Sequence, residues 1–298
     1  MRHSSIKHVN LAKKPKKFLY DCPMTDSFDI HDDGQLTIET AIANLQGDDI
    51  GLRMYAAWWL GRFRVNTDEA VQVLIQALED EDDRTPAGGY PLRRNAARAL
   101  GKLADTQAVP PLVQSLSCTD FYVREAAAQA LEKLGDPAAI PTLLQLLRDE
   151  LPGTLPAPEP PQLSQPFDAL IEALGTLGSV ESIPDIQPFL AHPTPRVQYS
   201  AARALYQLIP DPQEASQYGE RLVQALSNED LQLRRAVLAD LGAIGYLPAA
   251  EAISETLAEN SLKLIALKGL LEKELSISEE TTLSEGAKQV MELMDSLL

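Results

Sequence analysis

The stretch Tyr90–Leu103, YPLRRNAARALGKL, is an amphipathic helical pattern, and weaker copies of it recur along most of the chain. Its apolar residues Ala96, Ala97, Leu100 and Leu103 have the i, i+1, i+4, i+7 spacing that forms one stripe on a helix. Each copy is preceded by a shorter helical pattern with its own stripe. The core leucines that register the copies are Leu60, Leu100, Leu131, Leu174, Leu205, Leu241 and Leu270.

Two helices in a period of roughly 30–40 residues are typical of an α-solenoid, because stacked pairs can bury a stripe that one pair leaves exposed. The sequence therefore predicts an all-α superhelix of about seven HEAT-like pairs over residues 36–298. Insertions lengthen it near 80–90 and, with many prolines, near 149–166. The stretch SEGAKQVMELMDSLL is expected to form a C-terminal capping helix.

Residues 1–35 stand apart because they are basic and show no helical period. We expect a disordered arm there, with a basic partner-binding tail as the alternative. The chain as a whole carries a formal net charge of −17, which disfavours binding to nucleic acid or to an anionic membrane. It contains no apolar run long enough to span a bilayer and no secretory signal, so a reducing, cytoplasmic compartment is expected.

The sequence contains no catalytic, nucleotide-binding or metal-binding motif of known spacing. Its four histidines are scattered, and its two cysteines, Cys22 and Cys118, define no disulfide framework. We therefore identify no catalytic residue and no metal ligand.

Function is then expected on the second helices, which generally line the concave binding surface of a solenoid. The positions of Arg94, Arg98 and Gly101 form an exposed column beside the core stripe, with glycines expected to leave room for a ligand. Across the other repeats the column contains Met54, Trp58, Gly61, Glu125, Gln129, Glu132, Asp168, Glu172, Gly175, Tyr199, Arg203, Tyr206, Arg235, Ala239 and Gly242. A neighbouring column of arginines is expected to pair with acids of the adjacent repeat: Arg53, Arg93, Arg124 and Arg234.

The segment DFYVREAAAQALEKLGD (Asp120–Asp136) resembles the signature of HEAT and HEAT-like repeats. The motifs AAWWLGRFRV, GGYPLRRNAARALGKL and PFDALIEALGTLG, in this order, resemble the E subunits of the heterodimeric E/F-type phycobilin lyases of cyanobacteria. The resemblance implies a lyase subunit that acts with a homologous F subunit near phycobilisomes. It implies that phycocyanobilin is the substrate, that no cofactor is tightly bound, and that a thioether forms to a cysteine of the phycocyanin α subunit. Phycoerythrocyanin is a close variant as acceptor.

For such a substrate the columns supply arginines for the propionates, carboxylates for the pyrrole N–H groups and aromatic faces for the rings. The candidate bilin-binding residues are Trp58, Tyr90, Arg94, Arg98, Glu125, Asp168, Glu172, Tyr199, Arg203 and Tyr206. Because the register selected them, each could equally be an ordinary solvated side chain.

The first repeat is more apolar than a terminal repeat should be, so we predict that part of it, or the groove beside it, meets the partner subunit. The residues of this predicted interface are Met54, Tyr55, Trp59 and Phe63. Two other functions stay open: a non-catalytic HEAT-repeat scaffold or chaperone-like adaptor, and a carrier that binds bilin without ligating it.

Overall fold

The computed structural model describes residues 36–149, 164–277 and 283–298, without the side chain of Ile277. The predicted basic arm and most of the proline-rich insertion lie outside these ranges. Within them the chain forms fifteen α-helices, five short 3₁₀ helices and no strand. The α-helices are α1 (Ile38–Leu45), α2 (Ile50–Arg62), α3 (Asp68–Ala77), α4 (Pro91–Leu103), α5 (Val109–Ser115), α6 (Phe121–Leu134), α7 (Ile140–Arg148), α8 (Phe167–Thr176), α9 (Ile183–Ile186), α10 (Pro195–Leu208), α11 (Pro212–Ala225), α12 (Leu231–Ile244), α13 (Ala250–Glu255), α14 (Asn260–Ile277) and α15 (Glu285–Ser296).

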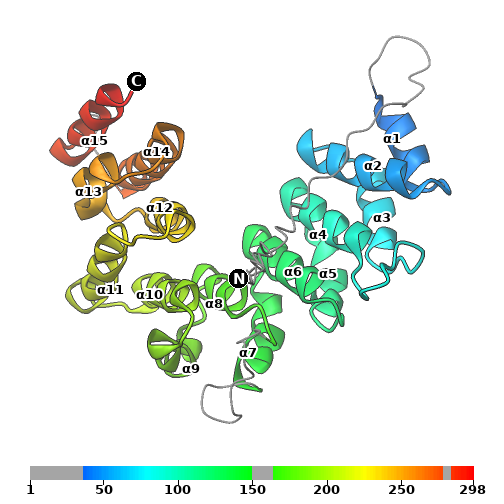
Figure 1. Ribbon diagram of the computed structural model, residues 1–298, viewed down its shortest axis with the longest axis horizontal. Helices are drawn as coiled ribbons and strands as arrows, with labels where there is room; N and C mark the ends of the chain where they lie inside the picture. Colours follow the sequence, from blue (N-terminus) through cyan, green and yellow to red (C-terminus); the bar gives the residue numbers. More distant parts are fainter. Residues whose placement is uncertain (1–35, 150–163, 278–282) are drawn as a thin grey trace, which may run out of the picture. The chain divides into compact units, whose positions relative to one another are not determined.

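The predicted helix pairs are present, and their second helices form a continuous row (Figure 1). Each second helix packs on the next one along the chain, and a first helix packs on one side of each. We call these helices the second-helix row: α2, α4, α6, α8, α10, α12 and α14. The helix α15 packs against α13 and α14 and forms the predicted C-terminal cap. The all-α solenoid of seven pairs is confirmed.

The helix ends explain how the repeats are delimited. Asp120 caps α6, its side chain accepting a hydrogen bond from the Tyr122 N–H at 2.9 Å. Gly135 and Gly245 end α6 and α12 in the left-handed conformation, at φ 69° and 66°. Ala104 ends α4 in the same conformation, at φ 58°, although it carries a Cβ.

The glycines of the exposed column do not leave room for a ligand, which corrects that expectation. They are contact points between successive second helices. A Cβ on Gly101 would lie 2.7 Å from the Cα of Ala130, and a Cβ on Gly175 would lie 2.7 Å from the Cα of Ala204. Because only hydrogen fits there, these glycines set the close spacing of the row.

The neighbouring arginine column stabilises each helix pair from within. All four arginines donate hydrogen bonds to main-chain carbonyls at or just after the end of the first helix of their own pair. Their positive charge therefore lies near the C-terminus of that helix, where the helix dipole favours a cation. Among the described residues, Arg53 alone also pairs with an acid of the next repeat, Asp80, and the expected pairing is not found for Arg93, Arg124 or Arg234.

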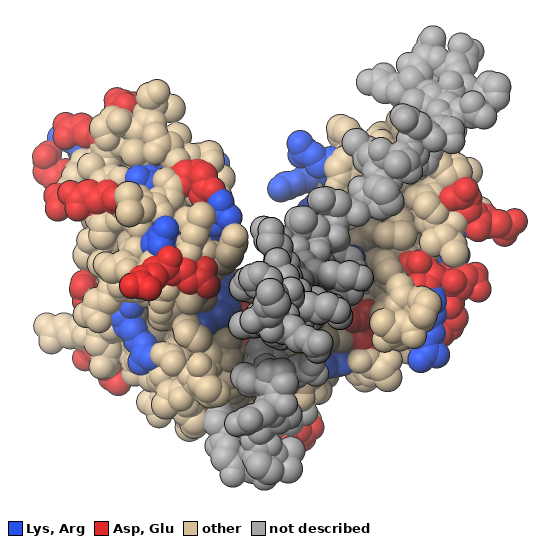
Figure 2. All heavy atoms as spheres, in the orientation of Figure 1, with Lys and Arg blue, Asp and Glu red and all other residues tan. Residues whose placement is uncertain are grey.

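Acidic and basic side chains are interspersed over the face that Figure 2 presents. A continuous basic surface, which nucleic acid requires, is not visible on that face. Among the described helices, none is both long and apolar enough to cross a bilayer.

Candidate functional site

Four residues of the exposed column bring opposite charges together on three consecutive second helices. Arg94 and Arg98 lie on α4, Glu125 on α6 and Asp168 on α8. We call these four residues the α4–α8 cluster. The helices α4 and α6 pack together, as do α6 and α8. The sequence register thus correctly placed these side chains along one row.

Among the described residues, no acid forms an ion pair with Arg94 or Arg98, and the Arg94 Nε is buried without a hydrogen-bond acceptor. Burial, with a further contribution from Arg94, lowers the pKa of Arg98. A negative charge added beside the two guanidinium groups would relieve their mutual repulsion.

Burial and the neighbouring arginines act in opposite directions on the Glu125 carboxylate. Burial raises the pKa of Glu125, and the nearby Asp168 raises it further, while Arg98 and Arg94 lower it. Glu125 forms no ion pair with any described residue. Asp168 has one ion-pair contact, its Oδ2 lying 3.9 Å from Nε of Arg196. Apart from the contact between Asp168 and Arg196, the α4–α8 cluster therefore presents donors and acceptors that form no ion pair among the described residues.

Aromatic rings flank the cluster. Tyr122 is 52% exposed, and the Arg94 guanidinium lies 6.0 Å from the centroid of its ring. Trp58 is exposed and stacks on Tyr55 with centroids 5.5 Å apart. Tyr122 was not predicted, although it lies one helical turn before Glu125 on the same face of α6. Extending the column by one turn towards the N-terminus would have found it.

In a second group of charged side chains, by contrast, each member forms ion pairs with other members of the group. The guanidinium of Arg203 on α10 pairs with Glu132 of α6, Glu172 of α8 and Asp240 of α12. Arg196 on α10 contacts the same Glu172 and Asp240. We call Glu132, Glu172, Arg196, Arg203 and Asp240 the buried ion cluster.

This arrangement corrects two predicted roles. Arg203 and Glu172 are each only 8% exposed, and both are held by partners within the fold. Ser200 also donates a hydrogen bond to Glu172 at 2.5 Å. Arg203 is therefore not available for a propionate, nor is Glu172 for a pyrrole N–H. Their physical role is to join α6, α8, α10 and α12.

The electrostatics of the buried ion cluster follow from its burial and its acid excess. Burial raises the pKa of Glu172 to about 7, with Arg196 and Arg203 opposing the rise and Asp240 adding to it. For Arg196, burial disfavours the charge, but Asp240 and Glu172 outweigh it and raise the pKa. Three acids and two arginines thus share one site in which each charge depends on the others.

Two members of the buried ion cluster, Arg196 and Asp240, were not predicted. Asp240 could have been recognised from the sequence. It occupies the repeat position at which Ala99, Ala130 and Ala204 contact the preceding second helix. An acid at a position reserved for alanine indicates a buried partner. Arg196 lies one turn before the predicted Tyr199, with nothing in the sequence to separate it from a surface arginine.

The remaining predicted aromatics do not join the α4–α8 cluster. Tyr90 is buried, and its ring is covered by the Arg93 guanidinium 4.0 Å from the centroid. Tyr199 is half-buried, and its hydroxyl is engaged by an asparagine. Tyr206 is also half-buried and packs edge-on against Tyr246, with centroids 5.3 Å apart. Burial of Tyr90 removes the face that stacking on a bilin would need.

The predicted partner interface lies on α2 and at its end. Phe63 is 61% exposed, and Tyr55 is exposed beside it in the same repeat. Trp59 packs on Phe63 with centroids 4.8 Å apart, and Met54 is half-buried. Trp58 is exposed as well, so three aromatic side chains of this repeat, Tyr55, Trp58 and Phe63, are exposed.

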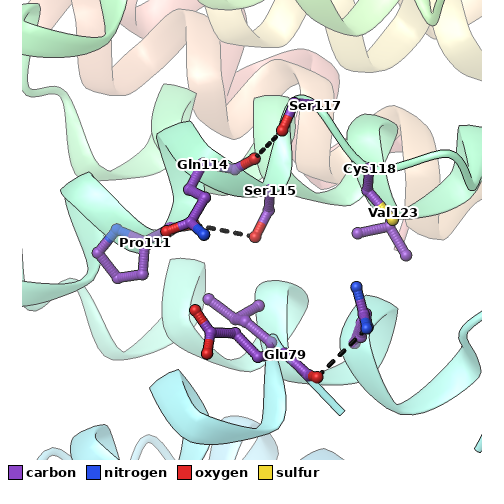
Figure 3. Close-up of a pocket in the computed structure, with 9 residues that line it drawn as sticks. Glu79, Pro111, Gln114, Ser115, Ser117, Cys118 and Val123 are labelled. Carbon is purple, nitrogen blue, oxygen red and sulfur yellow. Dashed lines mark hydrogen bonds between the residues drawn. The ribbon is translucent and has the colours of Figure 1, made fainter. Parts of the chain in front are cut away.

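A small cavity of about 210 Å³ lies between the ends of α3 and α5 (Figure 3). It contains none of the predicted site residues. Its lining residues are Leu78, Glu79, Arg93, Pro111, Gln114, Ser115, Ser117, Cys118 and Val123. Among the described residues, no group of histidine, cysteine and acidic side chains could hold a metal ion.

Known proteins share this architecture and sequence. Residues 90–155 match the family of HEAT repeats, and residues 52–80 match the PBS lyase HEAT-like repeat. The phycocyanobilin lyase subunit alpha of Microchaete diplosiphon is 73% identical over 270 residues, which cover 90% of this chain and 92% of that protein. The bilin biosynthesis protein PecE of Mastigocladus laminosus is 46% identical over 238 residues, covering 80% of this chain and 82% of that protein.

A solved structure extends the relationship to three dimensions. It is the complex of CpcE and CpcF of phycocyanin lyase from Nostoc sp. PCC7120. The matched chain has a TM-score of 0.80 and 57% sequence identity, covering 93% of this chain and 100% of that one. Because the sequence identity and the structural match both extend over at least nine-tenths of the chain, the chain belongs to the family of phycocyanobilin lyase alpha subunits.

Proposed function

We propose that this chain is the alpha (E-type) subunit of a heterodimeric bilin lyase. With an F-type partner it binds phycocyanobilin and attaches it by a thioether to a cysteine of the phycocyanin α subunit. The observation that carries the proposal is its likeness, over 93% of the chain, to a protein solved as part of the CpcE–CpcF complex of phycocyanin lyase. The acceptor is a phycobilisome protein, so we place the reaction in the cyanobacterial cytosol.

The α4–α8 cluster is our proposed bilin site. The two propionates of a bilin would pair with Arg94 and Arg98, which have no acid partner among the described residues. Pyrrole N–H groups would donate to Glu125 or Asp168. The rings would lie against the exposed faces of Tyr122 and Trp58, which are 52% and 47% exposed.

The chain itself contributes no nucleophile to this chemistry. The acceptor cysteine supplies the sulfur, which forms a bond to the ethylidene carbon of the bilin while the thiol proton is transferred to the adjacent ring carbon. No group leaves, so the reaction is an addition that needs no oxidant or reductant. The residues of the α4–α8 cluster would accelerate it by holding the chromophore in one conformation and position beside the thiol. In this proposal phycocyanobilin is a substrate and not a resident cofactor.

Reconstitution tests the proposal. The chain is co-expressed with an F-type subunit, the phycocyanin α subunit and a pathway that makes phycocyanobilin. A coloured adduct on the acceptor that survives denaturation in acid urea is expected. Failure to form an adduct with any bilin or acceptor would contradict the lyase function. Bilin that stays bound to this chain without transfer would instead indicate a carrier.

The site is tested with the double variant Arg94→Gln, Arg98→Gln. Its matched control is Arg235→Gln, because Arg235 stands in the same register on α12 but pairs with Glu259. We expect the double variant to lose at least tenfold in transfer rate, since two charge-assisted pairs to propionates would be lost. The control should transfer normally, and both proteins should keep their helicity. Near-normal transfer by the double variant would contradict the pairing of Arg94 and Arg98 with the propionates.

A further inference from the structure

The carboxylate of Asp168 is the one member of the α4–α8 cluster that contacts the buried ion cluster. Asp168 lies in the first turn of α8, and its side chain is 24% exposed. Its Oδ2 lies 3.9 Å from Nε of Arg196. The site and the buried ion cluster therefore meet at this pair.

Arg196 is held rigidly on its other edges. One terminal nitrogen pairs with Glu172 and the other with Asp240, whose side chains are 10% and 1% exposed. All three nitrogens of the guanidinium thus face carboxylates, and two of those carboxylates are buried. A planar guanidinium with fixed partners on two edges has little freedom on the third.

We propose that Asp168, of the two carboxylates in the α4–α8 cluster, accepts the pyrrole N–H groups, and that Arg196 is a positioning residue that fixes this carboxylate. This inference rests on the proposed function. Without Arg196, Asp168 would keep its place on α8 but lose its only ion-pair partner among the described residues. Its side chain would then sample other rotamers, or turn towards the site arginines, and the bilin would meet a less defined acceptor.

Arg203 supplies the matched control. It lies two turns after Arg196 on α10 and shares its two acid partners, Glu172 and Asp240. Its third partner is Glu132 and not Asp168. Arg196→Lys and Arg203→Lys should therefore disturb the buried ion cluster to a similar degree. Only the Arg196 variant should disturb the bilin.

The experiment uses the complex of this chain with its F-type partner, and phycocyanobilin as the probe. Affinity and the absorption maximum of the bound bilin are measured before any acceptor is added. We expect Arg196→Lys to weaken binding about fivefold to tenfold and to shift the absorption maximum, while Arg203→Lys changes neither. In an Asp168→Asn background, Arg196→Lys should cause no further change, because its effect passes through Asp168.

Each outcome decides between the alternatives. Equal effects of the two lysine variants, or an undiminished effect of Arg196→Lys in the Asp168→Asn background, would overturn the positioning role. If Arg196→Lys loses helicity, Arg196→Gln replaces it in the same two comparisons. Wild-type affinity and spectrum in Asp168→Asn would overturn the proposal in either case. A wild-type complex that takes up no phycocyanobilin would contradict the proposed function itself.

Discussion

The guanidinium of Arg94 lies 6.0 Å from the centroid of the Tyr122 ring, so a side chain of α4 rests against an exposed ring at the start of α6. Within the described part of the fold, the only other ring contact of Tyr122 is an edge-on one with Phe121, and the Arg94 Nε has no hydrogen-bond acceptor. A ligand at this place could therefore contact a positive charge and an aromatic ring together.

Replacing this ring should affect the ligand more than the fold. For Tyr122→Leu we expect bilin affinity to fall severalfold, because stacking and an exposed cation–π contact of about 0.5–1 kcal/mol are both lost. Tyr122→Phe keeps the ring and should bind almost normally. Absorption titration measures the affinity and thermal unfolding measures stability. Equal affinity of the two variants would exclude the ring from the site.

Gly101 should not tolerate even one added carbon. An alanine Cβ there would lie 2.7 Å from the Cα of Ala130, so α4 and α6 would have to move apart. We expect Gly101→Ala to destabilise the protein by about 1–2 kcal/mol despite the better helix propensity of alanine. Gly51→Ala is the control, because its Cβ would meet only a side-chain oxygen at 3.2 Å. Denaturant unfolding that ranks Gly101→Ala as the more stable variant would contradict the close-contact role.

Replacing Ala104 by glycine should stabilise the protein. Its φ of 58° is the left-handed conformation that α6 and α12 reach with Gly135 and Gly245. Ala104→Gly is expected to raise the free energy of unfolding by about 0.5–1 kcal/mol, because the Cβ penalty disappears. Gly135→Ala should lower it by a similar amount. A decrease for Ala104→Gly in thermal unfolding would show that its strain is compensated elsewhere.

Glu172 should make stability depend on pH. Its pKa in the folded chain is about 7, above its ordinary value of 4.5, so the native state binds more protons between these values. Stability should therefore fall as pH rises through this window, with a slope approaching ~1.4 kcal/mol per pH unit for one proton. Glu172→Gln should remove that part of the slope. Unfolding by denaturant at several pH values from 4.5 to 8 measures it, and identical slopes in both proteins would refute the assignment.

Phe63 should contribute to the heterodimer. It is 61% exposed at the end of α2, in contact with Trp59. Phe63→Ser should weaken binding to the F-type partner about tenfold or more while leaving helicity unchanged, because an apolar anchor is lost from the interface. Ile265→Ser, at an exposed position of α14, serves as control. Analytical ultracentrifugation or calorimetry would show whether the two variants differ.

The solenoid could be predicted from the sequence in detail, because its determinants are local. The i, i+4, i+7 stripe around Leu100 and the Asp120 cap each lie within one helix, and stacking is the only way to bury the stripes. The same register correctly placed Arg94, Arg98, Glu125 and Asp168 along one row.

Only the tertiary structure decided which of the charges are free. Arg98 and Arg203 occupy the same register position, yet Arg203 is enclosed by acids from three other helices and Arg98 by none within the described chain. The difference depends on Glu132, Glu172 and Asp240, which lie tens of residues from Arg203. Ion pairing between repeats is set by helix spacing and side-chain direction, and the period of a repeat contains neither. The sequence by itself therefore determined the row of helices, and packing determined which of its arginines remain for a ligand.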